Sequence, residues 1–233
     1  QAIENDGLSQ SEVFAPELTI WDQNRYTDWQ EELFGGVASS INLNMAVYGG
    51  NDQNTFRLGG SYFDQGSIFP GKFGYNKLTS NISISHRSKS NKFHLSFLAN
   101  YGVENNKIFD GTNFINYALS IPPNAPPIYN NNGSLNWENW VGDNPFAVLE
   151  QPQSILIENL LSNINLSYAI SPVIRFKINI GYSVLHNDDQ IMFHKERYNP
   201  DRWEFIKLGI IQNYSKRKSL VVEPQLNFSK TYD

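Results

Sequence analysis

Residues 159–184 read NLLSNINLSYAISPVIRFKINIGYSV, two runs of alternating side chains separated by a Ser-Pro break. In the first run every second residue is large and apolar except Ser162, and the residues between them are mainly Asn and Ser. The second run repeats the pattern, with Ile174 and Val184 at the ends of the apolar parity. Alternation with a period of two indicates β-strands whose two faces meet different surroundings. Either a protein core or lipid could cover the apolar face.

The composition excludes several classes of protein. The 233 residues carry a net charge of -5, so no nucleic-acid partner is expected. The chain contains no cysteine, which excludes disulfides, thiolate zinc sites and cysteine nucleophiles. No run approaches the roughly 20 apolar residues of a membrane-spanning helix. The first residues, QAIENDGLSQ, lack the basic and apolar regions of an export signal, so any such signal is expected upstream or already removed.

Further segments show the same alternation, so the sequence predicts about seven strands in total. Besides the opening pair, they cover residues 39–48, 55–63, 78–86, 92–103 and 219–230. The last segment contains Pro224, which a central strand tolerates only at a bulge or an unpaired position.

The predicted connections alternate between short turns and long loops. The long ones take about a dozen, more than about fifty and about thirty residues, which is unusual in a compact soluble domain. An up-and-down antiparallel sheet would then carry every short turn at one end, as transmembrane β-barrels do. Strands of this length, tilted by about 40–45°, span about 25 Å, the height of a lipid-facing band. Aromatic residues lie near both ends of this band, including Tyr182 and Phe176.

The sequence therefore predicts an all-β fold, a segment of an antiparallel up-and-down transmembrane β-barrel with long extracellular loops. A soluble carbohydrate-binding β-sandwich is the alternative, because about seven alternating strands with turn signals are also typical of sandwiches.

Four longer motifs follow one another along most of the chain. They are TDWQEELF at 27–34, GGNDQNTFRLGGSYFDQGSIF at 49–69, ALSIPPNAPPIYNNNGSLNWENW at 118–140 and NPFAVLEQ at 144–151. In this order they resemble the SusC/RagA-like TonB-dependent transporters of the Bacteroidetes outer membrane. The resemblance implies a barrel of about 22 strands in outer-membrane lipid, with an N-terminal plug. It also implies a TonB box that contacts the inner-membrane energy complex, a SusD-like surface lipoprotein as partner, and import of glycan or peptide oligomers.

The resemblance divides the chain into an extracellular loop segment, residues 1–37, and part of a receptor β-barrel, residues 38–233. Thr27 followed by Gln30 predicts a capping box at the start of a short helix in the loop segment. No plug, TonB box or closing C-terminal strand is recognisable, and about seven strands cannot close such a barrel. Residues 1–233 alone are therefore not expected to transport.

The search for catalytic chemistry finds no recognisable motif, so an enzyme is not expected, nor is a cofactor. The histidines are too scattered for a metal site, although two of them could meet near one hairpin end: His86 and His94.

Substrate binding is expected in the two longest loops, where aromatic rings could stack on sugars and Asn could bond hydroxyls. Packing of the loops or of a lid protein is the other interpretation of these residues. The candidates are Tyr129, Asn136, Trp137, Trp140, Tyr198, Arg202 and Trp203.

In the two opening strands and in the strand at 219–230, alternate side chains are expected to have opposite surroundings. The polar parity is assigned to the barrel lumen and the apolar parity to lipid. The lumen-facing residues are Asn163, Asn165, Lys177, Asn179 and Glu223, and the lipid-facing ones are Leu166, Ile178 and Ile180.

Overall fold

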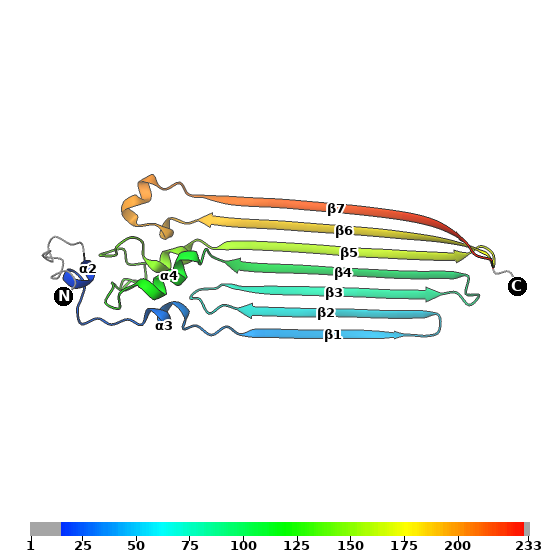
Figure 1. Ribbon diagram of the computed structural model, residues 1–233, viewed down its shortest axis with the longest axis horizontal. Coiled ribbons are helices and arrows are strands. Elements are labelled where there is room, and N and C mark those ends of the chain that lie inside the picture. Colours follow the sequence, from blue (N-terminus) through cyan, green and yellow to red (C-terminus); the bar gives the residue numbers. More distant parts are fainter. Residues whose placement is uncertain (1–14, 231–233) are drawn as a thin grey trace.

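The computed structural model describes residues 15–230, in which seven β-strands form one antiparallel sheet (Figure 1). Their order in the sheet is their order in the chain. The strands are β1 (Ser40–Gly50), β2 (Asn54–Gly66), β3 (Gly74–Arg87), β4 (Phe93–Ile108), β5 (Gln153–Ala169), β6 (Ile174–Phe193) and β7 (Gly209–Phe228). The expected up-and-down topology is confirmed. The β-sandwich alternative is wrong for the described residues, because a sandwich needs a second sheet.

The sheet is open in the described part of the chain, with β1 and β7 as its two edges. Pro224 lies in β7 opposite Ile178, so it occupies an edge strand, where proline is tolerated. Residues 1–14 of the predicted loop segment and residues 231–233 lie outside the described residues.

Several strands are longer than the alternation predicted. β5 begins at Gln153, β6 continues to Phe193 and β7 begins at Gly209. The sequence missed these extensions because the side chains lose their apolar alternation there, as in HNDDQ at 186–190, while the backbone pairing continues. The loops are consequently shorter than predicted, but the asymmetry between the two ends of the sheet is confirmed. Residues 67–73, 109–152 and 194–208 connect strands at one end, and residues 51–53, 88–92 and 170–173 at the other.

The strand register places the apolar parity of all seven strands on one side of the sheet, which we call the apolar face. Ile164 of β5, for example, pairs with Phe97 of β4 and with Ile180 of β6. A shift of one residue in any strand would turn its apolar side chains to the other side. Further members are Leu43, Val47, Leu58, Tyr62, Leu78, Ile82, Ile84, Leu95, Leu166, Ile178, Tyr182, Leu220, Val222 and Leu226.

Nothing in the described residues covers the apolar face. Met45, Leu220 and Leu226 are 79%, 66% and 68% exposed. The buried apolar residues instead lie beyond one end of the sheet, so residues 15–230 form no protein core on the sheet itself.

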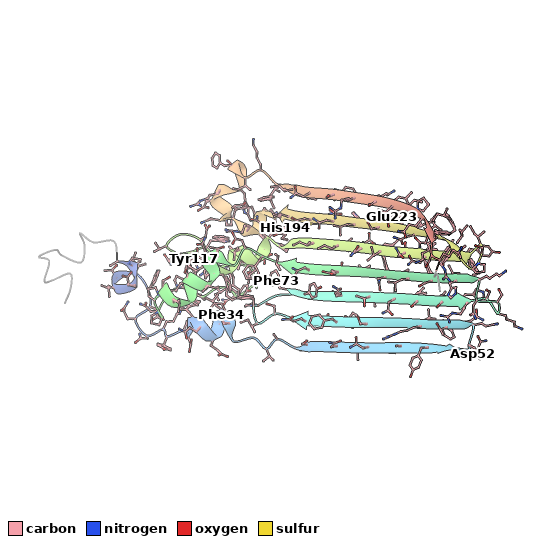
Figure 2. The ribbon with its side chains drawn as sticks, turned by 45° about the vertical axis from the view of Figure 1, so that its right-hand side comes forward. Phe34, Asp52, Phe73, Tyr117, His194 and Glu223 are labelled. Carbon is pink, nitrogen blue, oxygen red and sulfur yellow. The ribbon has the colours of Figure 1, made fainter. Side chains whose placement is uncertain are left out.

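The segment before β1 and two of the connections between strands pack together into what we call the loop cluster, formed by residues 15–38, 67–73 and 109–152 (Figure 1). Figure 2 shows Phe34, Phe73 and Tyr117 at this end and Asp52 at the opposite end. The helices of the cluster are α2 (Pro16–Thr19), α3 (Trp29–Phe34), α4 (Thr112–Ser120) and η1 (Pro145–Glu150). Its core consists of Trp21, Trp29, Leu33, Phe114, Ala118, Ala125, Ile128, Leu135, Phe146 and Ala147. No described helix is long and apolar enough to cross a membrane.

The predicted short helix is present as α3, but the expected cap is wrong. Asp28 caps it, because its Oδ1 accepts hydrogen bonds from the backbone N–H groups of Gln30 and Glu31 at 3.0 and 3.1 Å. The backbone N–H of Thr27 instead donates to the carbonyl of Pro123 at 2.8 Å. This contact ties the N-terminal segment to the β4–β5 loop.

Candidate functional site

The β4–β5 loop is held in shape by the buried side chain of Asn144. Its Nδ2 donates to the carbonyl oxygens of Ile128 and Asn136 at 2.7 and 2.8 Å, and its Oδ1 accepts from the N–H of Phe146 at 2.9 Å. Only 1% of Asn144 is exposed. One side chain therefore joins three parts of a long loop that has little regular structure.

Replacing Asn144 with alanine should destabilise this loop by about 1–3 kcal/mol, because the buried carbonyl of Asn136 and the buried N–H of Phe146 would lose their partner. Limited proteolysis of the natural protein should show faster cleavage between residues 121 and 144. Asn131→Ala, an exposed asparagine of the same loop, is the matched control and should leave the cleavage rate unchanged. Equal rates for both variants would mean that Asn144 does not organise the loop.

The N-terminal segment is fixed to the same loop through two tryptophans. Trp21 Nε1 donates to the carbonyl of Asn139 at 2.9 Å, and Trp29 Nε1 to that of Pro122 at 2.8 Å. The rings of Trp29 and Trp140 meet edge to face with centroids 5.9 Å apart. The structure thus uses Trp140, a predicted substrate contact, to pack the loop cluster.

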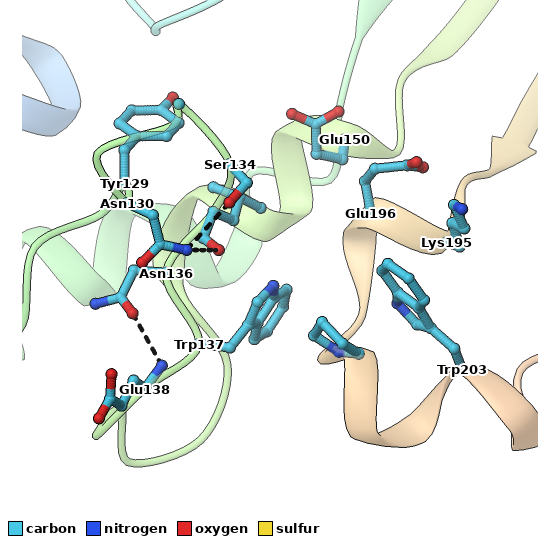
Figure 3. Close-up of a pocket in the computed structure, with 13 residues that line it drawn as sticks. Tyr129, Asn130, Ser134, Asn136, Trp137, Glu138, Glu150, Lys195, Glu196 and Trp203 are labelled. Atoms are coloured by element: carbon cyan, nitrogen blue, oxygen red, sulfur yellow. Dashed lines mark hydrogen bonds between the residues drawn. The ribbon is translucent and has the colours of Figure 1, made fainter.

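A cleft of about 640 Å³ lies between the β4–β5 loop and the β6–β7 loop, whose short helices are η2 (Lys195–Arg197) and η3 (Pro200–Phe205) (Figure 3). Trp137 borders the cleft from the first loop and Trp203 from the second. Four of the predicted substrate residues line this cleft, namely Tyr129, Asn136, Trp137 and Trp203. The other three predicted residues, Trp140, Tyr198 and Arg202, are not among its lining residues.

Tyr198 and Arg202 instead help to position the β6–β7 loop. The indole N–H of Trp203 donates to the carbonyl of Tyr198 at 3.0 Å, which orients the Trp203 ring. Arg202 lies 3.8 Å from the carboxylate of Asp143, and Arg197 lies 3.4 Å from it. These ion pairs connect the two loops on either side of the cleft.

The amide of Asn136 is engaged within its own loop. Its Nδ2 donates to the carbonyl of Pro127 at 3.0 Å, and its Oδ1 accepts from the N–H of Glu138 at 3.0 Å. Only 6% of the residue is exposed. Asn136 therefore shapes the wall of the cleft, which differs from the predicted role of bonding substrate hydroxyls.

Charged residues that the sequence did not single out also line the cleft, among them Glu150, Lys195 and Glu196. Burial, followed by the negative charges of Glu150 and Glu32, raises the pKa of the Tyr129 phenol. The phenol is therefore neutral and able to donate a hydrogen bond at neutral pH. No sequence signal could have selected these carboxylates, because charged residues are ordinary in solvated loops.

The polar parity of β5, β6 and β7 forms a hydrogen-bonded ladder. Asn163 Nδ2 donates to Asn179 Oδ1 at 2.7 Å, and Asn179 Nδ2 donates to Glu223 Oε2 at 2.9 Å. Asn165 also bonds Asn163, and Lys177 shares this side of the sheet. Leu166, Ile178 and Ile180 lie on the apolar face. The predicted separation of the two residue sets is thus present, whereas their assignment to lumen and lipid stays a prediction.

The histidines of the third and fourth strands do not approach each other as expected. His86 pairs with Leu95 and His94 pairs with Arg87, so the two histidines belong to neighbouring pairs of the ladder. Neighbouring pairs point to opposite sides of a sheet, so the two rings lie on opposite faces. Among residues 15–230, no group of three or more His, Cys, Asp or Glu side chains could hold a metal ion.

Comparison with known proteins finds similarity in structure but not in sequence. No protein-family model and no curated protein matches the chain. Among solved structures, the chain is similar to the structure of the RagAB peptide importer in the 'closed-closed' state, with a TM-score of 0.66 and 14% sequence identity. The match covers 91% of this chain and 24% of the matched chain. At this identity the likeness shows the fold alone: the described sheet and loops are folded like about a quarter of a chain of that importer.

Proposed function

We propose that this chain supplies adjacent strands and extracellular loops of an outer-membrane β-barrel transporter of the TonB-dependent type. One observation carries the proposal, the uncovered apolar face that runs across all seven strands. A continuous apolar surface of this size is rare on proteins dissolved in water, whereas the outer surface of a membrane barrel requires it.

The dimensions of the apolar face support a membrane setting. On β6 the apolar parity runs from Ile174 to Val184 and changes to His186 and Asp188 beyond it. At about 3.3 Å per residue and a tilt of about 40°, this stretch spans roughly 25 Å of membrane. Phe176 and Tyr182 lie near its two ends, as interface girdles require.

The open edges of the sheet support a larger assembly. Unpaired backbone groups are not tolerated in lipid, so β1 and β7 need further strands beside them. The likeness in fold to a peptide importer supports transport as the role of the complete barrel, and we assign no catalysis to the chain. On the resemblance noted above, the proposal includes a plug coupled to the TonB energy complex, a SusD-like lipoprotein at the extracellular end, and a glycan or peptide oligomer as cargo.

The proposal is tested with the natural protein in its own cells. It should fractionate with the outer membrane, migrate differently on gels before and after boiling, and support uptake of an oligomer only while the TonB energy complex is active. Recovery in the soluble fraction, or uptake that is unaffected when the energy complex is inactivated, would contradict it.

A further inference from the structure

We infer that the cleft between the β4–β5 and β6–β7 loops binds a protonated amine of the imported oligomer. This inference rests on the proposed function, since it names the chemical group that the transporter selects. An amine of this kind is carried by a lysine side chain of a peptide or by an amino sugar of a glycan.

Two tryptophan side chains provide the apolar walls. Trp203 is oriented by its N–H bond to the Tyr198 carbonyl, and its loop is fixed by the ion pairs to Asp143. The indole N–H of Trp137 has no partner among the described residues, so it is available to a ligand carbonyl or hydroxyl. Aromatic faces attract cations through the ring quadrupole.

The charge of the cleft selects the sign of the ligand. Its lining residues include three glutamates, Glu138, Glu150 and Glu196, but only one lysine, Lys195. None of these carboxylates forms an ion pair within the described residues. The arginines of the β6–β7 loop, Arg197 and Arg202, are not among the lining residues of the cleft, and both contact Asp143 outside it.

Lys195 shows where an ammonium group is accommodated. Its Nζ lies over the ring of Trp203, 4.7 Å from the ring centroid, and Figure 3 shows both side chains on the same side of the cleft. Lys195 is solvent-exposed, so a ligand ammonium could displace it at little cost. The protein's own lysine therefore acts as an internal competitor for the cation position.

The test uses the natural protein purified in detergent and two matched ligand pairs. One pair is a lysine-containing pentapeptide and the same peptide with the lysine acetylated, and the other is a glucosamine tetramer and its N-acetylated form. We expect the amine form of one pair to bind about 3- to 10-fold more tightly than its acetylated form. This is the gain that exposed ion pairs and a cation–π contact provide.

Variants separate this role from simple packing. Glu150→Gln combined with Glu196→Gln should clearly weaken the preference, because Glu138 and the Trp203 face remain, while Glu204→Gln, an exposed carboxylate of η3 outside the cleft lining, should keep it unchanged. Lys195→Met retains the apolar stem but removes the competing ammonium, so it should increase affinity for the amine form. A gain in affinity for the amine form in Lys195→Met and a loss in the glutamine variant could not both result from loss of folding.

The outcomes are distinguishable from failure of the proposed function. If the amine and acetylated forms bind with equal affinity, or are imported equally well, the inference is overturned and the transport function stands. A preference that is undiminished in the double glutamine variant also overturns it. If the protein is absent from the outer membrane and no oligomer binds, both proposals fail.

Discussion

An arginine at position 178 should lower the amount of the natural protein that folds in the outer membrane. Ile178 lies on the apolar face between Leu166 of β5 and Pro224 of β7, near the middle of the apolar stretch of β6. An arginine facing lipid at mid-depth costs about 2–4 kcal/mol, a factor of about 30 to 900 in the folding equilibrium. The measurement is the fraction of protein in the outer membrane that migrates faster before boiling than after it.

Asn179→Arg is the matched control, one residue along the same strand on the polar face. Its guanidinium would lie beside Glu223, whose carboxylate already accepts a hydrogen bond from Asn179 at 2.9 Å. The lumen of a barrel is hydrated, so this variant should fold at close to the normal level. Equal loss of membrane protein in both variants would indicate that protein rather than lipid covers the apolar face.

Phe114→Ala should disorder the loop cluster while the strands remain folded. Phe114 is fully buried, and its ring centroid lies 5.7, 5.3 and 5.8 Å from those of Phe69, Phe109 and Phe146. Replacing a buried phenylalanine with alanine lowers the free energy of unfolding by about 3–5 kcal/mol. We expect this loss to unfold a hydrophobic core as small as that of the loop cluster. Proteolysis of the loops should accelerate strongly, and binding at the cleft should fall.

The control for this variant is Leu119→Ala on the same helix, α4, where the side chain is 74% exposed. It should leave proteolysis of the loops unchanged. The gel shift on boiling should persist in both variants, because the loop core lies outside the sheet. Loss of that shift in Phe114→Ala alone would mean that the strands depend on the loop cluster for folding.

The sequence predicted the strands because each one carries its own local signal. Alternation in the opening stretch already separated Asn163 and Asn179 from Ile178, and the register keeps them apart. The strand ends were less predictable, because backbone pairing through residues 186–190 continues after the apolar alternation stops. Hydrogen bonding between strands does not depend on which side chains project from them.

The candidate site could be predicted only as a region. The composition indicated the two longest loops, but it could not tell that Trp140 packs on Trp29 while Trp137 and Trp203 border a cleft. The capping residue of α3 was also predicted one position too early. Asp28 and Thr27 are both good caps, and the contact of Thr27 with Pro123 depends on a segment that is distant in the sequence.

The sequence by itself determined the β-strands, their two unlike faces and the end of the sheet that carries the long loops. Only the tertiary structure decided which loop side chains are buried, that Asn144 joins three parts of one loop, and that Glu150 and Lys195 share a cleft. The physical reason is the range of the interactions. A period of two arises from neighbouring residues along one strand, whereas the loop contacts join residues far apart in the chain and leave no periodic signal.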